Sequence, residues 1–316
     1  MLPRPVSTKR RHGSPYNFKF LLSRSRATNL LVCILLGALF VSFVTNVHLY
    51  FSSNADEGLA RFKALASLLK PRKDLRNLIV VPGHAIWTGT DPDLRKNQDQ
   101  WAFQSFQANQ NAGRLELFFQ HISAGARYAL ADPHSLLVFS GGQTQRESST
   151  TEGESYLRLA LKANLLQSDI FSRATSEDFA LDSFQNLIFS IARFHEFTGH
   201  YPERILVVGY QMKRARFMDL HRAAIHWPEN RFDYIGMDLP GDNSQAQKGE
   251  EQNGYLPYVD DLYGCHGFLA DKRKQRNYAL RYPSYYLSSP ELRPLLTWCP
   301  QVHTELFKGT LPWLEA

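Results

Sequence analysis

The sequence predicts an α/β protein in which helices cover both faces of a parallel sheet, with a single transmembrane helix before it. Two junctions predict the sheet: residues 136–142 (LLVFSGG) and 205–214 (ILVVGYQMKR) are short apolar runs that reach glycine and lead into a helical pattern. A third observation predicts the membrane segment, because residues 30–51 carry no formal charge over about the 20 residues that span a bilayer. Ligands of open parallel sheets bind just outside the carboxyl ends of the strands, so the junctions also predict the place of a site.

The remaining elements follow from their patterns in chain order. The first strand is residues 77–83, a buried run closed by proline and glycine, and the long irregular segment 86–110 after it is of the kind that closes over a ligand. Helices are expected over residues 114–130, 151–166, 176–197 (with Ser176 as the N-cap) and 211–226, and further strands over 136–139, 205–208 and 232–237. Strands that alternate with helices favour right-handed crossovers and a Rossmann-like sheet.

Composition divides the chain into five segments. We expect a basic cytosolic tail (1–29), a transmembrane helix (30–51), a stem (52–76), the α/β domain (77–240) and a Tyr/Pro-rich extension packed on the core (241–316). Cys265 and Cys299 lie in the extension, and the sequence leaves open whether they form a disulfide or are two unpaired, buried residues.

Charge is divided unevenly along the chain. Residues 1–55 contain seven Lys/Arg and no Asp or Glu, which leaves 29 basic and 30 acidic residues in the rest. The folded part therefore has no basic excess for phosphate neutralisation, and we expect no nucleic-acid partner. The basic side of a spanning segment usually stays cytosolic, which predicts a single-pass membrane protein of the secretory pathway (Golgi or endoplasmic reticulum) with a lumenal C-terminal domain. The alternative is a mitochondrion, because the tail also fits an Arg- and Ser-bearing presequence.

Several polar groups follow the predicted strands. Ser140-Gly141-Gly142 ends one strand, where backbone N–H groups can approach an anion closely, and Glu154 opens the next helix. Arg214 lies at a helix start, which favours anions, and adds a bidentate donor. His84 follows the first strand and is the histidine best placed for acid–base chemistry.

The predicted third helix brings a polar stripe to the same region. Asp178, Asp182 and Asn186 are spaced i, i+4, i+8 and would share one face, so Asp182 and Asn186 are expected to point into the cleft. The chain contains neither GxGxxG nor a P-loop. It also lacks the ligand spacings of a zinc site, so no metal is predicted.

Read together, these segments resemble the domain of unknown function 218 family, the YdcF-like and SanA-like proteins, over about residues 77–237. The pieces that carry the resemblance are the Gly turn before His84, Arg114 on the first helix, Ser140-Gly141-Gly142, Glu154, Glu177 followed by Ser183 and Asn186, and the start Tyr210-Gln211-Met212-Lys213-Arg214-Ala215. Gln211 stands where the bacterial pattern usually has His. The long 86–110 segment and the extension look like a eukaryotic, membrane-anchored branch.

The resemblance implies a Rossmann-like fold and often a membrane anchor. Bacterial relatives are linked to envelope integrity, one is reported to bind S-adenosylmethionine, and no reaction is established for the family. The cofactor is therefore unknown, with an S-adenosylmethionine-like ligand as one candidate.

The hypothesis from the residues is a site for an anionic small molecule or a phosphorylated glycan or lipid headgroup. His84 would act as acid, and Asp182 or Glu154 as base or as a group that binds a hydroxyl. Binding residues would be Arg114, Ser140, Gly141, Gly142, Glu177, Ser183, Asn186, Gln211 and Arg214. The alternatives are a non-catalytic, nucleotide-like binding module and a scaffold whose extension docks a protein partner that the sequence does not identify.

Overall fold

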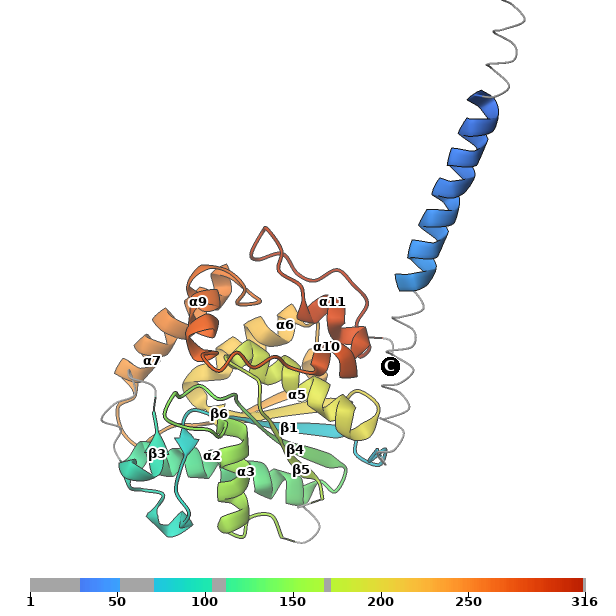
Figure 1. The fold of residues 1–316 in the computed structure, drawn as a ribbon. Helices are drawn as coiled ribbons and strands as arrows, with labels where there is room; N and C mark the ends of the chain where they lie inside the picture. Colours follow the sequence, from blue (N-terminus) through green and yellow to red (C-terminus); the bar gives the residue numbers. More distant parts are fainter. Residues whose placement is uncertain (1–28, 52–70, 104–111, 168–171, 315–316) are drawn as a thin grey trace, which may run out of the picture. The chain divides into compact units, whose positions relative to one another are not determined.

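The computed structural model describes residues 29–51, 71–103, 112–167 and 172–314 (Figure 1). The chain forms two compact units, Met1–Leu69 and Lys70–Ala316. In the first unit, the helix Asn29–Phe51 has a mean hydropathy of 2.5 and is long and apolar enough to cross a membrane. Residues 52–70 of the predicted stem lie outside the described residues.

The second unit confirms the predicted α/β fold. Its central sheet contains five parallel strands in the order β5-β4-β1-β6-β7. The strands are β1 (Asn77–Pro82), β4 (Ser135–Ser140), β5 (Ala174–Glu177), β6 (Arg204–Tyr210) and β7 (Phe232–Met237). A short antiparallel pair, β2 (Ile86–Trp87) and β3 (Trp101–Ala102), lies within the segment that was expected to be irregular, beside the 3₁₀ turns Pro92–Leu94 and Gln98–Gln100.

Helices cover both faces of the sheet, as Figure 1 shows. Successive strand side chains point to opposite faces, so Leu78 and Val80 enter one core whereas Ile79 and Val81 enter the other. The second core is closed by α2 (Ala112–Ala131) and α3 (Glu152–Lys162). The first core is closed by α5 (Ser183–Thr198), by a π-helical segment (Arg216–His221) with α6 (Arg222–Ala224), and by the C-terminal segment.

The C-terminal segment supplies a large share of that first core. Its elements are α7 (Ser244–Glu250), a π-helical turn (Glu251–Tyr255), α8 (Leu256–Asp260), α9 (Gly267–Arg276), α10 (Tyr285–Ser288), a 3₁₀ turn (Pro290–Leu292) and α11 (Arg293–Leu296). Tyr285, Leu295 and Trp313 are buried between these elements and the sheet. Because it buries such large apolar groups, this segment is part of the same compact unit as the sheet.

Two sequence predictions on the β5–α5 connection are wrong. Residues 174–177 form a strand and not the start of a helix, because they pair with β4 at the sheet edge. The helix begins at Ser183, and its cap is Asp182, whose carboxylate accepts a hydrogen bond from the backbone N–H of Gln185 at 2.9 Å. Asp178 therefore precedes the helix and does not share a helical face with Asn186.

The predicted helix 211–226 is a composite. A 3₁₀ turn, Gln211–Lys213, leads through Arg214 and Ala215 into the π-helical segment and α6. The changes in helical winding alter which side chains share a face, and they decide which basic residues of this stretch reach the cavity described below.

Candidate functional site

A cavity of about 1110 Å³ lies at the carboxyl ends of β1 and β6. The chain leaves β1 toward β4 on one side and later returns to β6 on the other, so this edge is the point where the strand order reverses. Open α/β sheets bind ligands at such points. The residues after β1 and β6 form one side of the cavity, and α7, α8 and α9 of the C-terminal segment form another.

His84 lies in the cavity wall directly after β1. Its backbone N–H donates to the hydroxyl of Tyr156 at 3.2 Å, and its ring lies 4.8 Å from the ring of Tyr210. Burial, and then the positive charge of Lys213, lower the pKa of His84 well below its ordinary value. The imidazole is therefore neutral at pH 7, which suits it to take part in hydrogen bonds as a neutral ring and not to serve as the expected acid.

Cationic side chains from two distant segments meet in the cavity. Lys213 follows β6, and its Nζ lies 3.3 Å from Nδ1 of His84, while Lys272 and Arg276 come from α9. Burial, and then the charge of Arg216, lower the pKa of Lys213 to about 7. Burial, and then the charge of Arg276, lower that of Lys272 to about 8.

These shifts show that the cations repel one another in a poorly solvated place. Arg216 has a partner, because its guanidinium lies 3.1 Å from the carboxylate of Glu250. The carboxylates of the cavity do not offset the remaining charges enough to keep both lysine pKa values at their ordinary level. An anion bound here would be attracted by several charges that the protein has already desolvated.

Glu152 is a buried carboxyl group of the cavity. It lies at the first position of α3, where Thr151 caps the helix, and Thr144 donates to its Oε1 at 2.5 Å. Burial raises its pKa, against the lowering effects of Thr144, Arg276 and Lys213. A Cβ at Gly83 or Gly141 would come within 2.5–2.8 Å of this side chain, so both glycines make room for it.

Asp182 also lines the cavity, but its carboxylate is fully engaged. It caps α5 and forms an ion pair with Arg273 of α9. Burial by itself would raise its pKa, and the charge and hydrogen bond of Arg273 outweigh that effect, so the net pKa is lowered. A carboxylate held in its charged form by an arginine is a weak base, which argues against the base role expected for Asp182.

Behind the cavity wall, Ser140, Glu177 and Asn186 form a buried hydrogen-bond network. The Ser140 hydroxyl donates to Oε2 of Glu177 at 2.6 Å and lies 3.1 Å from Oδ1 of Asn186. Burial raises the pKa of Glu177 to about 7, although hydrogen bonds from Ser140 and from the backbone N–H of Phe179 lower it. Of the three residues, Asn186 lines the cavity.

The backbone N–H groups of Gly141 and Gly142, which were expected to approach an anion, are hydrogen-bonded within the fold. The N–H of Gly141 donates to the carbonyl of Glu177 at 2.9 Å, and that of Gly142 donates to the carbonyl of Ala180 at 2.6 Å. Both donors thus close the junction between β4 and the chain that follows β5. The glycines are required by close packing, since a Cβ at Gly142 would lie 2.9 Å from the same carbonyl oxygen of Ala180.

The other expected residues divide between the cavity and the surface. Arg114 and Ser183 line the cavity together with His84, Asp182 and Asn186. Glu154 is exposed and accepts a hydrogen bond from Thr150. Gln211 and Arg214 are also exposed, and the Arg214 guanidinium donates to the carbonyl of Tyr234. The residues that line this cavity do not include Glu154, Gln211 or Arg214. The basic residues of the 211–226 stretch that line it are Lys213 and Arg216, and not the expected Arg214.

Sequence reasoning missed the residues that give the cavity its charge. Glu152 stands two positions before Glu154 in a capping-box pattern, and only its burial distinguishes the two. Lys272 and Arg276 are four residues apart and so share a face of α9. That spacing was a usable signal, although nothing in it indicated that α9 reaches the end of the sheet.

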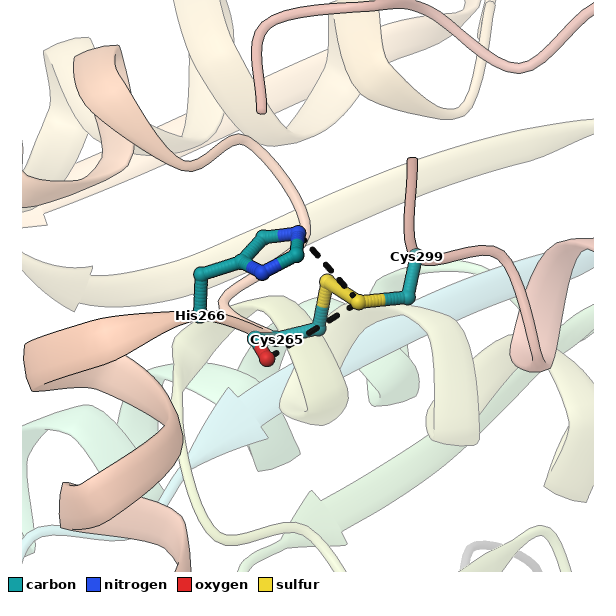
Figure 2. A group of neighbouring side chains, drawn as sticks. All are labelled: Cys265, His266 and Cys299. Atoms are coloured by element: carbon teal, nitrogen blue, oxygen red, sulfur yellow. Dashed lines mark hydrogen bonds between the residues drawn. A yellow bond between two sulfur atoms is a disulfide. The ribbon is translucent and has the colours of Figure 1, made fainter. Parts of the chain in front are cut away.

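A second group of reactive side chains lies in the C-terminal segment (Figure 2). Cys265 and Cys299 form a disulfide, and Nε2 of His266 lies 3.3 Å from Sγ of Cys299. The ligand atoms of the three residues lie within 4.8 Å of one another, which is a spacing that suits a metal ion. The disulfide uses both sulfur atoms, however, so the imidazole is the one ligand that this trio still offers.

The fold and the cavity define an α/β protein with a ligand-sized hollow at the switch point of a parallel sheet. No family model matches the chain, and no solved structure matches it. The chain is similar to a protein of Saccharomyces cerevisiae, described as "Uncharacterized protein YOR238W", with 29% identity over 253 residues that cover 63% of this chain and 83% of the relative.

Proposed function

We propose that the protein binds a small phosphorylated molecule in the cavity at the ends of β1 and β6. The observation that carries the proposal is that Lys213, Lys272 and Arg276 line the same cavity, where burial and their mutual repulsion disfavour their positive charges. A phosphate group offers two negative charges and several acceptor oxygens, which relieve that repulsion and pair with the desolvated donors. S-adenosylmethionine carries a net positive charge and fits this cavity less well.

The experiment is a thermal-shift titration of the full chain in detergent micelles. The probes are inorganic phosphate, a sugar phosphate and a polyprenyl phosphate, with S-adenosylmethionine as the competing candidate. A ligand of the native state raises Tm by mass action. Lys213→Met and Lys272→Met should each weaken phosphate binding by about tenfold or more, which corresponds to one desolvated charged hydrogen bond.

Lys162→Met is the matched control, because it removes the same charge from an exposed position in the last turn of α3. Equal affinity in wild type and both cavity variants would contradict the proposal. A larger shift with S-adenosylmethionine than with every phosphate would favour the nucleotide-like binding module. A larger shift with the sugar phosphate or the polyprenyl phosphate than with inorganic phosphate would identify the source of the phosphate.

We further propose that the protein is a eukaryotic, membrane-anchored member of the YdcF-like family with its C-terminal unit in the lumen of the Golgi or the endoplasmic reticulum. The apolar helix, the basic tail before it and the Cys265–Cys299 disulfide support this placement, since disulfides persist in oxidising compartments. Protease protection of sealed membranes tests it. Digestion of the C-terminal unit before detergent is added would contradict a lumenal location.

A further inference from the structure

Ser183 and His221 form a hydrogen bond at the cavity wall, and the proposed anion site uses neither residue. Oγ of Ser183 lies 2.7 Å from Nε2 of His221, a contact between residues 38 positions apart. Ser183 is the first residue of α5 and lines the cavity, whereas His221 ends the π-helical segment behind it. π-helical turns are rare and occur frequently at functional sites.

The surroundings of His221 keep its imidazole neutral. The side chain is fully buried, and its ring packs edge-on against Phe217 and Tyr258, with centroid distances of 5.2 and 4.5 Å. Nδ1 has no hydrogen-bond partner among the described residues. Burial, and then the charge of Arg216, lower the pKa of His221 well below its ordinary value, so the ring is neutral at pH 7. With the proton on Nδ1, Nε2 accepts the hydrogen bond of the Ser183 hydroxyl.

The start of α5 also suits a developing negative charge. The first N–H groups of an α-helix have no intrahelical partner, and the helix dipole favours an anion beside them. Asp182 takes one of these donors, the N–H of Gln185. The N–H groups of Ser183 and of the residue after it belong to the same first turn, and we expect them to donate to the oxyanion that forms on the substrate carbonyl when Oγ attacks.

We propose that Ser183 is a nucleophile activated by His221, and that the protein cleaves a carboxylic ester of the phosphorylated molecule that the cavity binds. This inference rests on the proposed function for the substrate class, while the Ser183–His221 pair stands on its own geometry. Such a pair, with a hydroxyl in hydrogen-bond reach of a base, is the arrangement that covalent acyl transfer requires.

The reaction balances with water as the second reactant. Oγ bonds to the ester carbonyl carbon while its proton passes to Nε2 of His221. The bond from that carbon to the alcohol oxygen then breaks, and the alcohol leaves with the proton from Nε2. Water attacks the acyl-serine, again giving a proton to Nε2, and the carboxylic acid departs as this proton returns to Oγ.

The test is covalent modification of the full chain by a fluorophosphonate, followed by mass spectrometry of the modified peptide. The chain offers a matched control: Oγ of Ser289 lies 3.2 Å from Nδ1 of His195, and neither residue lines the cavity. We expect Ser183 to be modified and Ser289 to remain free. His221→Gln should slow modification by ~100-fold or more, the usual contribution of a general base, while His195→Gln leaves the rate unchanged.

Each outcome decides the inference. Absence of modification at Ser183 in folded wild-type protein would overturn it, and so would an unchanged rate in folded His221→Gln. If His221→Gln does not fold, the preference for Ser183 over an exposed serine such as Ser284 in wild type decides alone. A phosphate-induced thermal shift without modification of Ser183 would support the anion site and overturn the assignment of Ser183 as a nucleophile. Modification of Ser183 without any phosphate-induced shift would support the nucleophile and overturn the anion site.

Discussion

Replacing Glu177 by glutamine is expected to change how stability depends on pH. The buried carboxyl has a pKa of about 7 in the folded chain, against an ordinary value of 4.5. The native state therefore holds a proton that the unfolded chain releases between pH 4.5 and 7. Stability must fall as the pH rises through this window, by about 3 kcal/mol in total, since one pKa unit corresponds to 1.36 kcal/mol. Glutamine resembles the protonated carboxyl and does not titrate.

The assay is urea unfolding of wild type and Glu177→Gln at pH 5 and pH 8.5, followed by the fluorescence of the buried tryptophans. At pH 5 the variant should be no more stable than wild type, because the glutamine oxygen can keep the hydrogen bond from Ser140 while its NH2 then faces the N–H of Phe179. At pH 8.5 the variant should be more stable than wild type by about 3 kcal/mol. Structural relaxation around the ionised Glu177 carboxylate would stabilise wild type and reduce this difference. A stability difference that is the same at both pH values would refute the reasoning.

Three further predictions concern packing, the α5 cap and the anion site. Gly153→Ala should cost about 3 kcal/mol of stability, because its Cβ would lie 2.5 Å from two backbone carbonyl oxygens, whereas Gly249→Ala meets nothing within 4 Å and should be neutral or stabilising in urea unfolding. Asp182→Ala should cost about 3 kcal/mol, since it removes the cap and leaves Arg273 without its carboxylate; the double variant with Arg273→Met should regain part of this loss. Sulfate binding, measured calorimetrically, should weaken ~10-fold or more from pH 6 to pH 9 as Lys213 and Lys272 lose their protons, and a constant affinity would contradict the role of these lysines.

The sheet could be predicted because most of its strands are apolar on both faces. β1, β4 and β6 contain continuous runs of valine, leucine and isoleucine or aromatic residues, which is typical of strands buried between two helical layers. In β7, Asp233 and Gly236 interrupt the apolar run. β5 has the sequence ATSE and lies at the sheet edge, so it carries no such run. Its polar residues read as a helix start, and the misplaced helix followed from that reading.

The candidate site could be predicted only where it lies on the strand ends. His84, Asp182, Ser183 and Asn186 reach the cavity because the residues that follow parallel strands gather at one edge. Lys272 and Arg276 come from a segment without clear periodicity, and His221, at the end of the π-helical segment, contacts Ser183 across 38 positions of the chain. No local pattern in the sequence encodes such contacts between remote segments.

The disulfide between Cys265 and Cys299 has a practical consequence for any work on the cavity. It closes a loop of the chain that contains α9, the helix that carries Lys272 and Arg276. A thiol reductant in the purification buffer would open this loop and release the helix from one of its restraints. Ligand screens with dithiothreitol would therefore examine a looser binding wall than screens in an oxidising buffer, and a failed screen in the first condition calls for repetition in the second.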